Sequence, residues 1–178
     1  NHEELHDMEN AINDFSKVIK IVPSNIFAML GMVRCLLRDI DNETNLKNGL
    51  KLVKELMDIH DQRNFDVYFL RAKLLWRLGK HSDALHWIGL CETRFGKNNP
   101  EVLFTKARIL VTCQRLDEAE EIMHNLPRRE SAFVHGRIEY EKKHYVHASR
   151  LFREYIDHGS LCDEDTGSAV INYLSSSI

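Results

Sequence analysis

An eight-residue segment that occurs three times constrains the fold of this chain more than any other feature. The copies span residues 66–73, 101–108 and 130–137. Each begins with an acid, has Phe three residues later, a small residue three after that, and then a base. An alanine follows the first residue of every copy by 18 positions. A fixed period of this kind is typical of stacked repeat proteins. The sequence therefore predicts a repeat surface that holds partners.

Composition and charge agree with a compact helical protein. The 178 residues are 43% hydrophobic and 29% charged, with only three Pro and eight Gly, which argues against disorder. The formal net charge of −3 provides no overall field toward nucleic acid or an anionic membrane. No apolar run approaches the roughly 18 residues of a membrane span. We therefore expect an intracellular protein of the cytoplasm or nucleus.

The cysteines and histidines show no complete metal site in the sequence. Cys35, Cys91, Cys113 and Cys162 lack CxxC spacing, so reduced and mostly buried thiols are expected. His144 and His147 are an i, i+3 pair, but no Cys or carboxylate set is placed to complete a site. A solvated turn is the prediction there, with no metal and no cofactor.

The apolar pattern Ala11, Phe15, Val18, Val22 predicts a helix that Pro23 ends. Ser24 is placed to cap the next helix. Residues 1–6 are interpreted as the stub of a preceding helix, and the natural chain is expected to extend upstream because a repeat buries its face against a neighbour.

Further helices are predicted along the rest of the chain from the same periodicity. The first has Phe27 on its apolar face, and the shortened spacing before Pro127 implies a trimmed helix end there. Gly79 suits a left-handed turn between paired helices. The predicted helices span 26–37, 46–60, 65–78, 82–93, 101–113, 117–126, 130–143, 146–158 and 163–174.

Helix pairs of about this length, with small residues where the helices cross, resemble the tetratricopeptide repeat. Small residues match the eighth position of that motif, small residues match its twentieth, and larger ones match its twenty-fourth. The three sets are Gly31, Ala72, Ala107 and Gly136; Ala11, Gly49, Ala84, Ala119 and Ala148; and Phe15, Val53, Ile88, Met123 and Phe152.

The resemblance implies an all-α, right-handed superhelix of stacked antiparallel helix pairs. The implied units are residues 1–23, 24–62, 65–99, 100–127 and 129–158, with an extra or capping helix and tail at 161–178. The motif departs from the family pattern at Cys91, Leu126 and Tyr155, where a small residue is common.

The resemblance also implies a concave groove lined by the first helix of each pair. The candidate partner-binding residues are the aromatic and basic groove positions Phe69, Lys73, Trp76, Phe104, Arg108, Phe133, Arg137 and Tyr140. A peptide with acidic and apolar residues would suit such a surface. The alternative is that the Phe rings pack between helices and the bases are solvated, and the sequence leaves both explanations open.

Other functions are weighed on the same residues. In the first helix of each unit, the fifth and ninth positions carry Phe and a base. The clamp for chaperone C-terminal tails has Lys and Asn at these positions, so such tails are not expected as ligands. Homodimerisation remains an alternative, as does RNA binding, although the latter calls for a basic protein. Family analogy suggests a scaffold in a multi-protein complex, such as the anaphase-promoting complex.

Catalysis is not predicted. The sequence has no Gly-rich phosphate loop, no Gly-x-Ser-x-Gly and no His-Glu-x-x-His. The carboxylate pairs Glu118/Glu121 and Glu139/Glu141 are expected on exposed helix faces.

Overall fold

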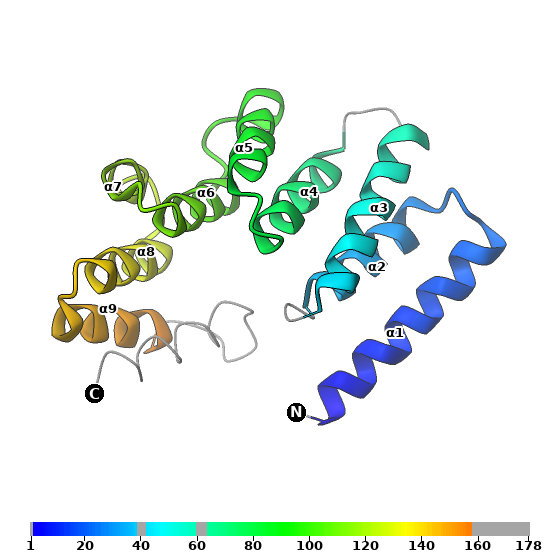
Figure 1. Ribbon diagram of the computed structural model, residues 1–178, viewed down its shortest axis with the longest axis horizontal. Coiled ribbons are helices and arrows are strands. Elements are labelled where there is room, and N and C mark those ends of the chain that lie inside the picture. Colours follow the sequence, from blue (N-terminus) through cyan, green and yellow to red (C-terminus); the bar gives the residue numbers. More distant parts are fainter. Residues whose placement is uncertain (1, 39–41, 60–63, 158–178) are drawn as a thin grey trace. The chain divides into compact units, whose positions relative to one another are not determined.

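The computed structural model describes residues 2–38, 42–59 and 64–157. For residues 2–6 only the backbone is described. All regular secondary structure in these ranges is helical (Figure 1). The helices are α1 (His2–Ile21), α2 (Ile26–Arg38), α3 (Glu43–Ile59), α4 (Phe65–Arg77), α5 (His81–Phe95), α6 (Pro100–Thr112), α7 (Leu116–Met123), α8 (Arg128–Glu141) and α9 (Tyr145–Asp157). None of these helices combines the length and the apolar run that crossing a membrane requires.

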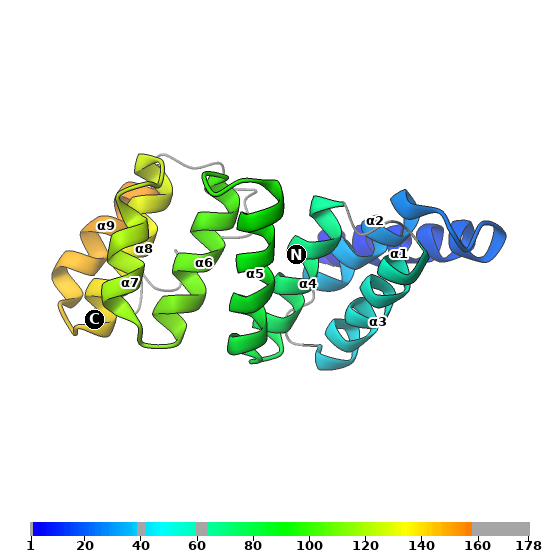
Figure 2. The ribbon, with the colours of Figure 1, turned by 90° about the horizontal axis from the view of Figure 1, so that it is seen from above.

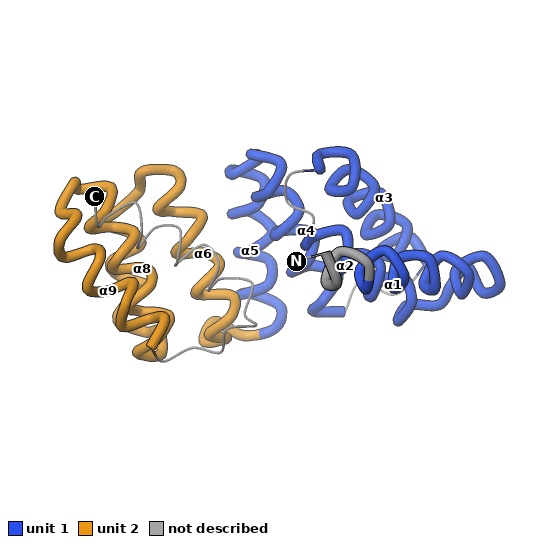
Figure 3. The backbone as a smooth tube through the Cα atoms, turned by 90° about the horizontal axis from the view of Figure 1, so that it is seen from below, with its two compact units in different colours: residues 1–95 blue, residues 96–178 orange. Residues whose placement is uncertain are grey.

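The helices form two compact units, residues 1–95 and 96–178 (Figure 3). Within each unit, helices that follow one another in the chain pack together, and Figure 2 shows α8 and α9 lying side by side. The first helices of successive pairs also touch, α2 with α4 in the first unit and α6 with α8 in the second. This arrangement brings the repeated eight-residue segments of α6 and α8 next to each other.

The alanines of the repeat are completely buried. Ala72, Ala84, Ala107, Ala119 and Ala148 are each 0% exposed. A methyl group is small enough for two helix backbones to approach closely, so large apolar side chains on either side can interdigitate. In the first unit this core includes Val33, Val53, Leu56, Leu70 and Leu74.

An asparagine caps the N-terminus of the first helix in three successive helix pairs. Asn25 Oδ1 accepts the Ala28 N–H at 3.0 Å. Asn64 and Asn99 accept N–H groups at the starts of α4 and α6 in the same way. Such caps satisfy amide groups that have no partner inside the helix. Asn25 is thus the N-cap of α2, and the prediction that Ser24 caps this helix is wrong.

Three helices end in the same left-handed turn. Gly79, Gln114 and Lys143 have φ angles of 73°, 60° and 65°. Each donates its N–H to the carbonyl three residues back, and the next residue donates to the carbonyl five residues back. This pair of bonds is the Schellman motif. The sequence pointed to the turn only at Gly79, because Gln and Lys carry no signal for it.

Several boundaries differ from the sequence prediction. Residues 2–6 belong to α1, which runs without interruption from His2, and are not the end of a separate helix. The helix predicted from residue 46 begins at Glu43. Phe27 is 83% exposed and does not face the core. The trimmed helix before Pro127 is confirmed, since α7 ends at Met123. The helix predicted at 163–174 lies outside the described residues.

Candidate functional site

The aromatic and basic residues of the second unit form one contiguous contact between α6 and α8. The rings of Phe104 and Phe133 meet edge to face with their centroids 5.6 Å apart. The guanidinium carbon of Arg108 lies 5.2 Å from the centroid of Phe104 and 5.4 Å from that of Phe133. A cation at these distances is attracted by the negative faces of the rings. The structure therefore brings together two Phe residues and one base of the repeated segments.

The Phe rings of this contact are also part of the core of the second unit. Phe104 and Phe133 are buried. Phe133 further contacts Phe152 at 6.0 Å and Tyr155 at 5.0 Å between centroids, both on α9. These rings hold helices together, whereas Arg108 is only half-buried. The part of this contact that reaches the surface is therefore the base.

Arg137 and Tyr140 form the next step along α8. The guanidinium carbon of Arg137 lies 5.9 Å from the Tyr140 ring centroid, and its Nη2 lies 3.2 Å from Oε1 of Glu141. Both Arg137 and Tyr140 are half-buried. The neighbouring carboxylate limits how strongly Arg137 can attract a further acid.

The candidate residues of the first unit lie on α4. Phe69 is buried and stacks on Phe65 with centroids 5.4 Å apart. Lys73 Nζ lies 5.5 Å from the Phe69 centroid, which repeats the cation–aromatic contact of Arg108. Trp76 is half-buried beside Arg77, whose guanidinium carbon is 5.1 Å from the ring. The eight predicted residues are thus divided between the units: Phe69, Lys73 and Trp76 in the first and the other five in the second.

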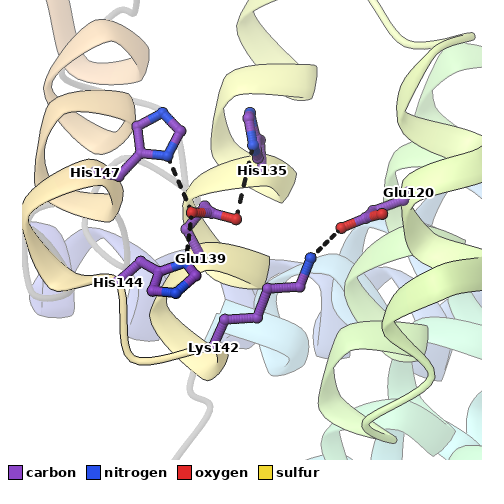
Figure 4. Close-up of polar contacts among 6 residues, drawn as sticks. All are labelled: Glu120, His135, Glu139, Lys142, His144 and His147. Carbon is purple, nitrogen blue, oxygen red and sulfur yellow. Dashed lines mark hydrogen bonds and ion pairs between the residues drawn. The ribbon is translucent and has the colours of Figure 1, made fainter.

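A second cluster of chemically active side chains surrounds Glu139 at the turn between α8 and α9 (Figure 4). Oε2 of Glu139 lies 3.0 Å from Nδ1 of His144 and 3.0 Å from Nδ1 of His147. Nε2 of His135, one helical turn before Glu139, lies 4.0 Å from Oε1. The rings of His135 and His147 are nearly perpendicular, with centroids 5.2 Å apart. Three imidazoles therefore converge on one carboxylate.

The environment of this cluster shifts the pKa values of its members. Partial burial lowers the pKa of His135, because burial disfavours the charged imidazolium, and the charge of Glu139 opposes this effect. Partial burial alone would raise the pKa of Glu139, but hydrogen bonds from His147 and His144 outweigh it, and the net shift is downward. Glu139 is therefore an ionised acceptor at neutral pH. Beside it, Lys142 donates a hydrogen bond to Glu120 on α7.

This cluster corrects two expectations. The His144 and His147 side chains are exposed as predicted, but the expectation that no carboxylate is placed beside them is wrong, since Glu139 contacts both. Glu139 does not lie on an exposed face, since its side chain is only 12% exposed. The i, i+4 spacing of His135 and Glu139 was a readable signal. The position of His147 beside Glu139 could not be recognised in the sequence, because it depends on the packing of α9 against α8.

Comparison of the sequence with family models and with curated proteins gives no match. Comparison of the structure with solved structures gives several. TTC0263, a thermophilic tetratricopeptide-repeat protein of Thermus thermophilus, has a TM-score of 0.75 at 14% identity over 98% of this chain and 92% of that one. A tetratricopeptide-repeat protein of Parabacteroides merdae has a TM-score of 0.63 at 15% identity over 97% and 67%.

YrrB, a tetratricopeptide-repeat protein with an unusual peptide-binding site, has a TM-score of 0.59 at 15% identity over 98% of this chain and 86% of that one. The matched lengths extend over almost the whole chain in each case. The chain therefore has the all-α helical-repeat fold of the tetratricopeptide-repeat proteins, as its repeated segment predicted.

Proposed function

We propose that this protein binds a protein or peptide segment that carries acidic and apolar side chains. The observation that carries the proposal is the position of Arg108 over both Phe104 and Phe133. Two buried rings on two helices hold a half-buried cation in one place. The guanidinium therefore offers a positive charge next to apolar ring surface.

The chemistry of this contact suits a carboxylate. A guanidinium stacked on a ring keeps its N–H groups in its own plane, directed away from the ring face. Hydrogen bonds between such a group and a carboxylate are shorter and stronger than neutral ones. A ring edge beside the cation offers apolar contact to a neighbouring Leu or Phe of the ligand. Acidic and apolar residues in one segment would use both.

The fold supports the same proposal. YrrB, which shares the fold, carries a peptide-binding site, and Lys73 over Phe69 on α4 repeats the Arg108 arrangement in the first unit. In this proposal the protein works by binding and not by catalysis, as a scaffold within a multi-subunit assembly. The ligand is a segment of another subunit.

The test uses an array of synthetic peptides that vary independently in acidic and apolar content, probed with the labelled 178-residue chain. We expect binding to peptides that contain both kinds of residue, weakening as salt screens the charges. The double variant Arg108→Glu/Arg137→Glu should lose roughly tenfold or more in affinity, because it replaces attraction by repulsion.

A matched control has the same change in net charge at exposed positions of the same unit. Lys97→Glu/Arg150→Glu serves this purpose, since both side chains are exposed. Binding that survives in the control and not in the Arg108 variant supports the site. Equal losses of affinity in both variants would attribute the effect to net charge. Unchanged binding in both variants would reject the site. Circular dichroism checks that each variant is folded.

A further inference from the structure

We propose that His135, Glu139 and His147 form a binding site for a divalent transition-metal ion, with Zn²⁺ the ion that suits it best. Each of the three residues offers a ligand atom, and these atoms all lie within 4.8 Å of one another. Among the residues that the structure describes, this is the set of His, Cys and carboxylate groups that meets such a distance. The site is independent of the aromatic and basic contact proposed above.

The ligand types match the metal. Zn²⁺ takes imidazole nitrogen and carboxylate oxygen at about 2.0–2.2 Å, so neighbouring ligand atoms in a tetrahedral site lie roughly 3.4 Å apart. Oε2 of Glu139 lies 3.0 Å from Nδ1 of His147, and Oε1 of Glu139 lies 4.0 Å from Nε2 of His135, so the two separations fall on either side of this value. Because the ligand atoms lie up to 4.8 Å apart, metal binding would draw the more distant ones closer together.

The backbone already holds the ligands in register. His135 and Glu139 lie one turn apart on α8, so their side chains share a helix face. His147 lies in the first turn of α9, next to Ala148, which is 0% exposed at the crossing with α8. A metal ion would therefore bind to groups that folding has brought together, and little ordering is left for binding to accomplish.

The site leaves room for a fourth ligand. His144 Nδ1 lies 3.0 Å from the same Glu139 oxygen as His147, and its side chain is 63% exposed. His144 and His147 also line an open surface hollow with Lys143, Tyr145, Val146 and Arg150. Either the His144 imidazole or a water molecule could complete a tetrahedral shell from that side.

A metal would bind each imidazole through an unprotonated ring nitrogen. The His144 and His147 rings face an ionised carboxylate through Nδ1, so in the metal-free protein these nitrogens carry the proton. When Nδ1 of His147 binds a metal, the ring proton is carried by its other nitrogen.

The competing explanation is a hydrogen-bonded cluster that joins α8 to α9 and has no affinity for metals. Isothermal titration of the full chain with ZnCl₂, with thiols kept reduced by a phosphine, distinguishes the two. We expect one Zn²⁺ ion to bind per chain with saturation, and the double variant His135→Gln/His147→Gln to lose this binding. Each single variant should weaken binding by at least about 10–100-fold, the loss expected even for an outer-shell partner.

His124→Gln is the matched control, because His124 is an exposed histidine of the same unit outside the cluster. It should leave the titration unchanged. At a hundredfold excess of Zn²⁺ over Kd, Tm should rise by roughly 5–10 °C in the wild type and the control and stay unchanged in the double variant.

A second readout does not depend on stability. Co²⁺ in a tetrahedral N/O site has visible absorption that the double variant should lack, with circular dichroism showing that it is folded. Retention of the same equivalent and affinity in His135→Gln/His147→Gln would overturn the proposal. So would the absence of any saturable equivalent in the wild type.

Discussion

Gly136 of α8 lies directly against the ring of Phe152 of α9. A β-carbon at position 136 would lie 2.8 Å from Cε1 and 2.9 Å from Cδ1 of Phe152. The Phe152 ring is 0% exposed, so neighbouring atoms keep it from moving aside. Glycine at this position therefore sets how closely α8 and α9 approach, and with it the position of the histidine–glutamate cluster between them.

Gly136→Ala should destabilise the protein although alanine is the better helix former. Overpacking of a buried ring costs about 1–3 kcal/mol, and the gain in helix propensity offsets up to about 1 kcal/mol of it. We expect a net loss of up to about 2 kcal/mol in the free energy of unfolding, measured by urea denaturation.

Gly89→Ala provides the control. Gly89 is also within a helix, but a β-carbon there meets nothing within 4 Å. This variant should gain about 0.5–1 kcal/mol from propensity alone. Opposite signs for the two glycines would support the close approach at Gly136, and a stabilised Gly136→Ala would contradict it.

Lys143→Gly should stabilise the turn between α8 and α9. Lys143 has φ of 65°, a left-handed conformation that glycine adopts without the steric cost borne by other residues. We expect a gain of about 0.5–1 kcal/mol in urea denaturation. Lys143→Ala removes the same side chain and keeps the β-carbon, so it should show no such gain. Equal effects of the two substitutions would attribute the change to the lysine side chain.

Asn99→Ala should cost about 1 kcal/mol of stability. Asn99 Oδ1 accepts the N–H of Glu101 at 3.0 Å and that of Val102 at 3.4 Å, and alanine leaves both without this acceptor. Asn99→Asp keeps an oxygen in place and adds a charge that the helix N-terminus favours, so it should retain or exceed wild-type stability. Thermal unfolding monitored by circular dichroism compares the three proteins. A loss in the Asp variant as large as in the Ala variant would show that the cap is not what stabilises α6.

Cys91 should resist alkylation in the folded protein. Burial raises the pKa of its thiol from 9.0 to about 12, so almost no thiolate is present at pH 8. Cys35 and Cys113 are half-buried and should react with iodoacetamide first. Mass-spectrometric mapping of the modified peptides over time measures each site. Modification of Cys91 at the rate of Cys113 would refute the assignment.

The raised pKa of the Cys91 thiol should also make the stability of the protein depend on pH in the alkaline range. The unfolded thiol loses its proton near pH 9, whereas the folded thiol keeps it until about pH 12. The unfolded state therefore binds fewer protons in this interval, and stability falls as pH rises from 9 to 12. Below pH 9 both states are protonated and the contribution is fully present. Cys91→Ala should show a smaller alkaline loss than the wild type.

Much of the fold could be predicted because its determinants are local and periodic. The spacing of small and apolar residues indicates which face of each helix is buried, and the period of the repeated segment indicates that the helices come in pairs. The buried alanines at positions 72, 84, 107, 119 and 148 are where this pattern placed them. The predicted starts of α2 and α4 are confirmed, whereas the starts of α3 and of α5 to α9 differ from the prediction by one to three residues, because the apolar period defines the face of a helix better than its first residue.

The candidate sites were less predictable because they depend on which helices become neighbours. The repeated segments identified Phe104, Arg108 and Phe133, but only the packing of α6 on α8 showed that one guanidinium covers both rings. The carboxylate beside His144 and His147 was missed for the same reason. Glu139 was assigned to an exposed face of α8, and α9 covers that face.

That this protein consists of helical pairs can be read from its residues, since a pattern of acid, Phe, small residue and base that occurs three times buries its apolar side against neighbouring copies. Which polar groups meet depends on the packing of the helices. Burial follows from the period of one helix, whereas a contact between Glu139 and His147 requires the crossing of two helices, and Gly136 against Phe152 determines that crossing.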